Sequence, residues 1–104
     1  MRKFYLLKNV TATGSGPSGE VPQDARLSVQ AIGSTTSGAG SATVLVEGSN
    51  NDANWLTIMM ITLELSTSAS SDGAAEEVPW LYVRATLASI SGTGATVDVI
   101  MVTV

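Results

Sequence analysis

Apolar and polar residues alternate with a period of two along most of the chain, and runs rich in glycine and serine separate the alternating stretches. This alternation predicts β-strands that bury one face and expose the other. Six strands are expected, at Lys3–Lys8, Arg26–Ile32, Ala42–Glu47, Asn54–Ser66, Trp80–Ser89 and Ala95–Val104. No stretch has the apolar stripe of an amphipathic helix, and Ala74–Glu77 has room for one short turn at most.

The segments between these strands have the composition of loops and turns. Loops are predicted where glycine, serine and proline gather, at Thr11–Pro22, Gly33–Gly40 and Ser66–Gly73. Tight turns are predicted at Gly48–Asp52 and Ser91–Gly94.

Short antiparallel strands joined in this way predict an all-β fold. We expect an antiparallel β-sandwich, jelly-roll-like, with about six to eight strands. The grouping of Arg26–Glu47 and Trp80–Val104 suggests two hairpins, one in each of two packed sheets. A chain of 104 residues suits a single domain, residues 1–104.

Two predicted strands are apolar on both faces, which exceeds what a monomeric sandwich needs. In the stretch Trp55–Ile61, the residues Trp55, Ile58 and Met60 are interface candidates, although a loop or the first strand could also cover them. At the C-terminus, Ile100, Val102 and Val104 lie opposite Val99 and Met101. We expect a neighbouring subunit to bury this terminal strand, the alternative being burial within the monomer.

The strand Trp80–Ser89 alternates cleanly, with Leu81, Val83, Ala85 and Leu87 predicted to face inward. Its outward face carries Trp80, Tyr82 and Arg84, residue types that are enriched at protein–protein interfaces. Two interpretations stay open. These three residues form a contact surface, or Trp80 covers the end of the sandwich while Arg84 pairs with a nearby acid.

The charge of the chain is sparse and unevenly placed. Charged residues make up 13% of the chain, and the net charge is −4. After residue 50 there are six acids and one base, Arg84, so no basic patch suggests nucleic-acid binding. The first apolar stretch, Phe4–Leu7, is too short for a signal peptide, and no stretch approaches the length of a membrane span.

The residue types that carry most catalytic chemistry are missing. Cysteine and histidine are both absent, which excludes a thiol nucleophile, a disulfide and the commonest general base. A serine–lysine pair through Lys3 or Lys8 has no supporting motif, and Asn50–Asn54 has too few acids for a calcium site. We therefore expect no enzyme activity, no cofactor and no metal.

Four segments resemble small structural proteins of tailed bacteriophages: Thr43–Asn50, Asn54–Trp55, Pro79–Ala85 and Ser89–Val97. In that group a strand ending in Gly-Ser and a tryptophan precede a Trp-x-Tyr-x-Arg-Ala strand and a Gly-Thr-Gly-Ala hairpin. The resemblance covers roughly residues 27–102. It implies a β-sandwich or jelly-roll part of a virion, often trimeric, and it supplies no catalytic residues.

The expected function is therefore structural. The chain is predicted to be a bacteriophage virion protein that decorates or cements the capsid, assembled in the host bacterial cytoplasm. Its expected partners are copies of itself, with a trimer favoured, and the major capsid or other virion proteins. One alternative is a tail tube, neck or tail-terminator subunit. The other is a carbohydrate-binding β-sandwich in which Trp55, Trp80 and Tyr82 would stack on sugar rings.

Overall fold

The computed structural model describes residues 2–21, 26–77 and 80–103, and these form strands joined by loops. The strands are β1 (Arg2–Val10), β2 (Gly14–Ser15), β3 (Gly19–Glu20), β4 (Arg26–Ser34), β5 (Ser37–Ser49), β6 (Leu56–Leu65), β7 (Ser70–Glu77), β8 (Tyr82–Thr93) and β9 (Thr96–Thr103). Within the described residues there is no helix, and so none that could cross a membrane.

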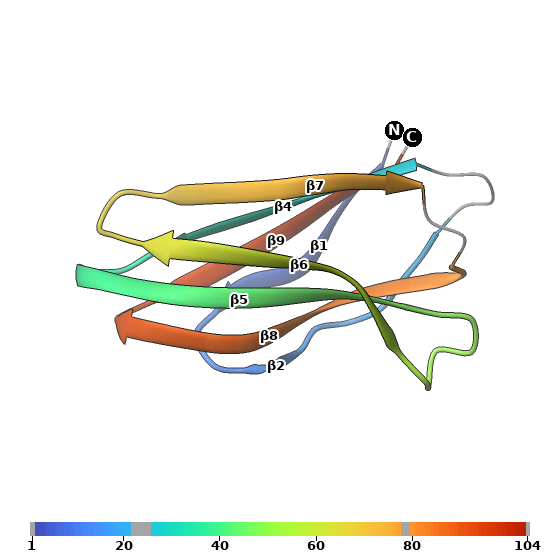
Figure 1. Cartoon of the computed structure of the whole chain (residues 1–104), viewed down its shortest axis with the longest axis horizontal. Coiled ribbons are helices and arrows are strands. Elements are labelled where there is room, and N and C mark those ends of the chain that lie inside the picture. Colours follow the sequence, from blue (N-terminus) through green and yellow to red (C-terminus); the bar gives the residue numbers. More distant parts are fainter. Residues whose placement is uncertain (1, 22–25, 78–79, 104) are drawn as a thin grey trace.

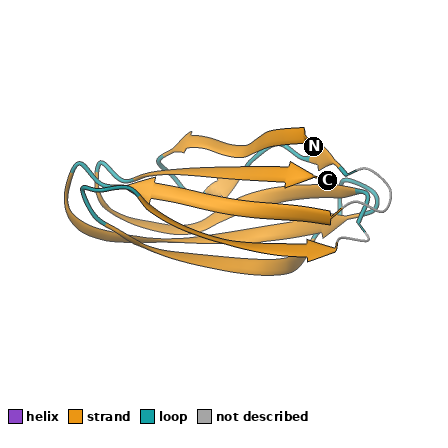
Figure 2. Ribbon diagram, turned by 90° about the horizontal axis from the view of Figure 1, so that it is seen from above, coloured by secondary structure: helices purple, strands orange, loops and turns teal. Residues whose placement is uncertain are grey.

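The strands form two antiparallel sheets that pack face to face (Figures 1 and 2). The four-stranded sheet has the order β1-β9-β4-β7. The five-stranded sheet has the order β2-β8-β5-β6, and β3 also pairs with β8. If β2 and β3 are counted as one interrupted strand, this is the order of an eight-stranded jelly roll. The predicted all-β, jelly-roll-like sandwich is confirmed.

The core lies between the two sheets and is built from the inward residues of nearly every long strand. Buried and exposed residues alternate along β4, β8 and β9 as the apolar and polar residues of the sequence do, because successive side chains of a strand point to opposite faces. The fully buried side chains include Leu27, Val29, Val44, Val46, Val83, Leu87, Val97, Val99 and Met101. Leu81 was expected among them, but it precedes β8 and is exposed.

The two predicted hairpins are wrong. The strands β4 and β5 follow each other in the chain, yet they belong to different sheets, and so do β8 and β9. The turns near residues 35 and 94 therefore carry the chain from one sheet to the other. Here Gly92 and Gly94 have φ angles of 121° and 62°, which favour glycine. The long-range pairs β5–β8 and β4–β9 hold the sheets instead.

Three segments predicted to be loops contain strands. Most of Gly33–Gly40 belongs to β4 and β5, and Thr11–Pro22 contains β2 and β3. Ser66–Gly73 was expected to be a loop throughout, but β7 begins at Ser70 and pairs with β4 over eight residues. Backbone pairing at the edge of a sheet needs no apolar side chains, which explains why the hydrophobic pattern did not reveal β7.

Candidate functional site

The outer face of the five-stranded sheet carries a polar network at its centre. Glu47 on β5 lies opposite Arg84 on β8. The Nε of Arg84 donates a hydrogen bond to Glu47 Oε1 at 3.0 Å, and the Thr86 hydroxyl donates to the same oxygen. The hydroxyl oxygens of Thr86 and Ser15 are 2.8 Å apart, which extends the network to β2. Four side chains from three strands are thus joined across the sheet.

This network is partly removed from water. The side chains of Arg84 and Glu47 are 26% and 14% exposed. A charge-assisted hydrogen bond in such a setting contributes more than a fully exposed ion pair does. The open interpretation in which Arg84 pairs with a nearby acid is confirmed, and Glu47 is that acid.

Trp55 packs against the same arginine. The guanidinium carbon of Arg84 lies 4.3 Å from the centre of the Trp55 ring, so the two form a cation–π contact. A side-chain cap orders the turn before Trp55: Asn51 Oδ1 accepts hydrogen bonds from the amides of Ala53 and Asn54. The turn predicted from the asparagines and Asp52 is therefore present, and Asp52 has the positive φ of 57° that such turns need.

Trp80 does not share the outer face with Arg84. A Cβ added to Gly48 would lie 2.6 Å from Cγ of the Trp80 ring, so the indole occupies the space that a side chain at residue 48 would fill. Gly48 lies opposite Val83, which is completely buried, and Trp80 packs against the core. Trp80 covers the end of the sandwich, as the second interpretation held, and the two tryptophans do not form one platform.

Among the described residues, the edge strand β6 presents the most exposed large apolar side chains. Met60 is 66% exposed and Leu56 is 59% exposed, and Met60 lies beside Leu45 on the outer face. Ile58 differs from them because it is half-buried and packs against the core at a β-bulge. No described segment covers Met60 or Leu56, so the alternative in which a loop or the first strand covers them is not found among the described residues.

On the outer face of the four-stranded sheet, the central strand β9 carries an apolar stretch. Ile100 and Val102 on β9 are half-buried and point away from the core, while Val104 lies outside the described residues. Tyr5 on β1 lies beside Ile100 and is 42% exposed. The ammonium groups of Lys3 and Lys8 lie 5.5 and 5.2 Å from the centre of the Tyr5 ring.

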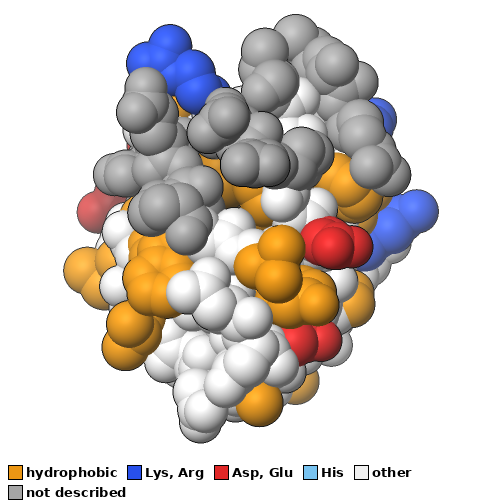
Figure 3. Space-filling model, turned by 90° about the vertical axis from the view of Figure 1, so that its right-hand side faces the viewer, with side chains coloured by type: hydrophobic (Ala, Val, Ile, Leu, Met, Phe, Trp, Pro, Cys, Tyr) orange, Lys and Arg blue, Asp and Glu red, His pale blue; other side chains and the backbone are white. Residues whose placement is uncertain are grey.

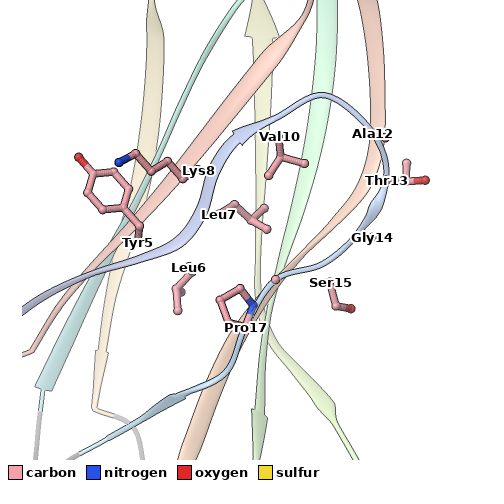
Figure 4. A pocket seen from close by; sticks show the side chains of 11 residues that line it. Tyr5, Leu6, Leu7, Lys8, Val10, Ala12, Thr13, Gly14, Ser15 and Pro17 are labelled. Carbon is pink, nitrogen blue, oxygen red and sulfur yellow. The ribbon is translucent and has the colours of Figure 1, made fainter.

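A pocket of about 400 Å³ opens between β1 and the segment that contains β2 (Figure 4). Its lining is mainly apolar side chains and backbone, with Leu7, Val10 and Pro17 facing the opening. Figure 4 shows Tyr5 and Lys8 together on the opposite side of the β1 ribbon. The pocket brings no base to a nucleophile and no acid to a second acid, so its residues offer shape without reactive chemistry.

On the side of the molecule shown in Figure 3, the hydrophobic side chains of the described residues lie in separate groups, with uncharged and acidic atoms between them. Among the described residues no three acidic side chains gather into a group that could hold a metal ion.

Sequence reasoning found Arg84, Trp55 and Met60 but missed Glu47, Thr86 and Ser15. The signal that could have found Glu47 was its place as the acid in an outward position of a central strand. Its partner depended on the pairing of β5 with β8, which the hairpin prediction had excluded. When the chain was compared with known proteins, no family model, no curated protein and no solved structure matched it.

Proposed function

We propose that this chain is a structural protein of a bacteriophage virion, which decorates or cements the capsid and works by assembly with neighbouring subunits. Its chemistry is the burial of apolar area at repeated contacts. The observation that carries the proposal is the pair of uncovered apolar side chains on the edge strand β6: Met60 on the outer face beside Leu45, and Leu56 opposite Gly48 beyond the β-bulge. Exposed apolar side chains on an edge strand are liabilities in a monomer and are useful in an assembly.

Two further observations support this proposal. The strand order is that of a jelly roll, an architecture used by viral capsid proteins and also by other classes. The segments around Gly48, Trp55, Tyr82 and Gly94 resemble those of phage structural proteins. The fold by itself does not select a function, so the virion setting rests on the resemblance.

The arrangement of the aromatic residues gives no comparable support to sugar binding. One face of the Trp55 ring is occupied by Arg84, and Trp80 lies against Gly48 and the core. A stacking site for a pyranose needs an open, flat aromatic face.

The proposal is tested with purified phage particles from the host that produces the chain. Mass spectrometry should find the chain in intact virions, and electron microscopy should place it on the capsid surface. Its absence from virions would overturn the proposal, and a position on the tail would replace decoration with the tail or neck alternative.

A paired variant tests the surface. In particles assembled with Leu56→Asp/Met60→Asp we expect incorporation to fall by at least about tenfold, because the charges oppose apolar burial. Thr62→Asp is the matched control, since Thr62 is exposed on the same strand and the same face as Met60. The control should be incorporated normally.

A further inference from the structure

The outer faces of the two sheets carry exposed charges of opposite sign. On the four-stranded sheet, Lys3 and Lys8 are both exposed. Lys3 lies opposite Val102, whose side chain points away from the core. The ammonium groups of both lysines lie 5.5 and 5.2 Å from the centre of the Tyr5 ring, which places them together on this outer face. We call this surface the basic face.

Two further charged side chains are described on the basic face. Asp98 is half-buried on β9, and its Oδ1 accepts a hydrogen bond from the backbone amide of Asn9. Arg26 is exposed on β4, opposite Glu77 of β7. Even without Arg26, the two exposed lysines outnumber the one half-buried acid among the described side chains of this face.

The outer face of the five-stranded sheet, which we call the acidic face, has the opposite sign. Glu20 lies opposite Tyr82 and is exposed. Glu64 is one of the exposed residues that alternate with buried ones along β6. Among the described side chains of this face the only base is Arg84, and it is paired with Glu47. The exposed charge of the acidic face therefore comes from glutamates.

Each face also offers apolar surface beside its charges. On the basic face, Ile100 and Val102 are half-buried, and Ile100 lies opposite Tyr5, which is 42% exposed. On the acidic face, Met60 is 66% exposed and lies opposite Leu45. A contact between the two faces would thus bury apolar side chains from both partners.

The shape of the sandwich allows such a contact. The two outer faces point in opposite directions because the sheets pack against each other through their inner faces (Figure 2). A second copy stacked on the first therefore brings an acidic face to a basic face. Four strands of about nine residues span roughly 600 Å². This area is at the lower end of what each partner buries in a specific interface.

Like charges oppose the other two ways of stacking. Two basic faces in contact would set lysines against lysines, and two acidic faces would set glutamates against glutamates. Like charges that meet across an interface are costly and suppress wrong pairings. Only the contact of an acidic face with a basic face joins opposite charges.

We propose that copies of this chain stack head to tail, with the acidic face of one copy against the basic face of the next. This contact rests on the proposed function and names the surfaces that join the copies. Met60 of one copy is buried against the face that carries Tyr5 and Ile100 of the next. Because the two surfaces differ, the contact is heterologous, and it closes into a ring or continues as a filament.

Charge reversal on either face tests the contact, with sedimentation of the purified chain at tens of micromolar and low salt as the readout. We expect the wild type to sediment above the 10.7 kDa of one chain. Lys3→Glu/Lys8→Glu and Glu20→Lys/Glu64→Lys should each weaken association by at least about tenfold, because like charges then meet. A one-to-one mixture of the two variants should regain the lost mass, because each face of one variant then finds a complementary face on the other.

The control places the same change of net charge outside both faces. Asp72→Lys/Thr67→Lys/Ala69→Lys raises the net charge by as much as Glu20→Lys/Glu64→Lys does. Thr67 and Ala69 are exposed in the loop between β6 and β7, and Asp72 lies opposite Ala31, whose side chain points into the core. This control should keep the wild-type mass. Circular dichroism should show that all variants keep the strand spectrum.

The salt dependence of the wild type gives a second measurement that needs no variant. The sedimenting mass should fall as salt is raised, because salt screens the attraction between the two faces. The Thr62→Asp control of the virion test adds an acid to the acidic face and so does not oppose this contact.

Restoration of the mass in the mixture supports the stacking of the two faces. Folded variants that associate as well as the wild type, a mixture that regains nothing, or a wild-type mass that salt does not change would overturn this contact and leave the proposed function standing. A wild type that stays monomeric would also overturn the contact, whereas the virion test alone decides the proposed function.

Discussion

The outer faces of the two sheets distribute polar and apolar residues in opposite ways. The five-stranded sheet has a polar centre, where Glu47 joins Arg84 and Thr86, and an apolar edge at β6. The four-stranded sheet has an apolar stretch on its central strand β9, with Ile100 and Val102, and exposed charged residues on its edge strands β1 and β7. The comparison shows that the two sheets of one sandwich differ in their edges. The edge strand β6 exposes apolar side chains, whereas the edge strands β1 and β7 expose charged ones.

Substitutions on the outer face of the five-stranded sheet should lower stability more than substitutions on the outer face of the four-stranded sheet. We expect Glu47→Ala to lower the free energy of unfolding by about 2 kcal/mol, because Arg84 and Thr86 lose their shared acceptor. For a domain of this size the melting temperature should fall by about 10 °C. Thermal unfolding followed by circular dichroism measures this change. Glu64→Ala, at an exposed position of the same sheet, should stay within about 0.5 kcal/mol of the wild type. Equal losses of stability for the two substitutions would show that the polar network does not stabilise the sheet.

The centre of the four-stranded sheet should respond less strongly. Ile100→Ser removes a half-buried apolar side chain that no polar network replaces, so the expected loss of stability is about 1 kcal/mol. Urea unfolding measures it, with the exposed neighbour Gln30→Ser as the control that should change stability little. A loss for Ile100→Ser larger than that for Glu47→Ala would reverse the comparison.

The smallest expected effect concerns Trp55. A double-mutant cycle with Trp55→Leu and Arg84→Met should give a coupling free energy of about 0.5–1 kcal/mol, the usual value of a cation–π contact near the surface. Chemical denaturation of the four proteins in the cycle provides the measurement. A coupling free energy of zero would show that the contact of the two side chains adds nothing to stability.

The pattern of the sequence predicted the long strands well and the sheet order poorly. The inward residues Val83, Ala85 and Leu87 follow from alternation, because burial of one face is a property of each strand by itself. The pairing of β5 with β8 joins residues far apart in the chain, and nothing in the local pattern selects it over a hairpin with β4. The strand β7 was missed because Ser70–Gly73 has no apolar residue to reveal a strand.

In the candidate site, too, local residue patterns were predictable from the sequence and contacts between distant strands were not. The sequence singled out Trp80, Tyr82 and Arg84 by residue type, but it could not show which face of the sheet each side chain lies on. Trp80 covers the end of the sandwich because Gly48, on a strand of distant sequence, leaves space for its ring. Arg84 stays on the outer face because its acid, Glu47, comes from the paired strand. Strand pairing therefore decides that Trp80 packs against the core whereas Arg84 lies on the outer face.

The central claim is that this chain works by assembling with copies of itself and other subunits. Sedimentation equilibrium of the purified wild-type chain, at tens of micromolar in low salt, tests self-assembly most directly. The account predicts a mass that is a multiple of 10.7 kDa, because copies bury the exposed apolar side chains of β6. A mass of one chain at every concentration would contradict self-assembly.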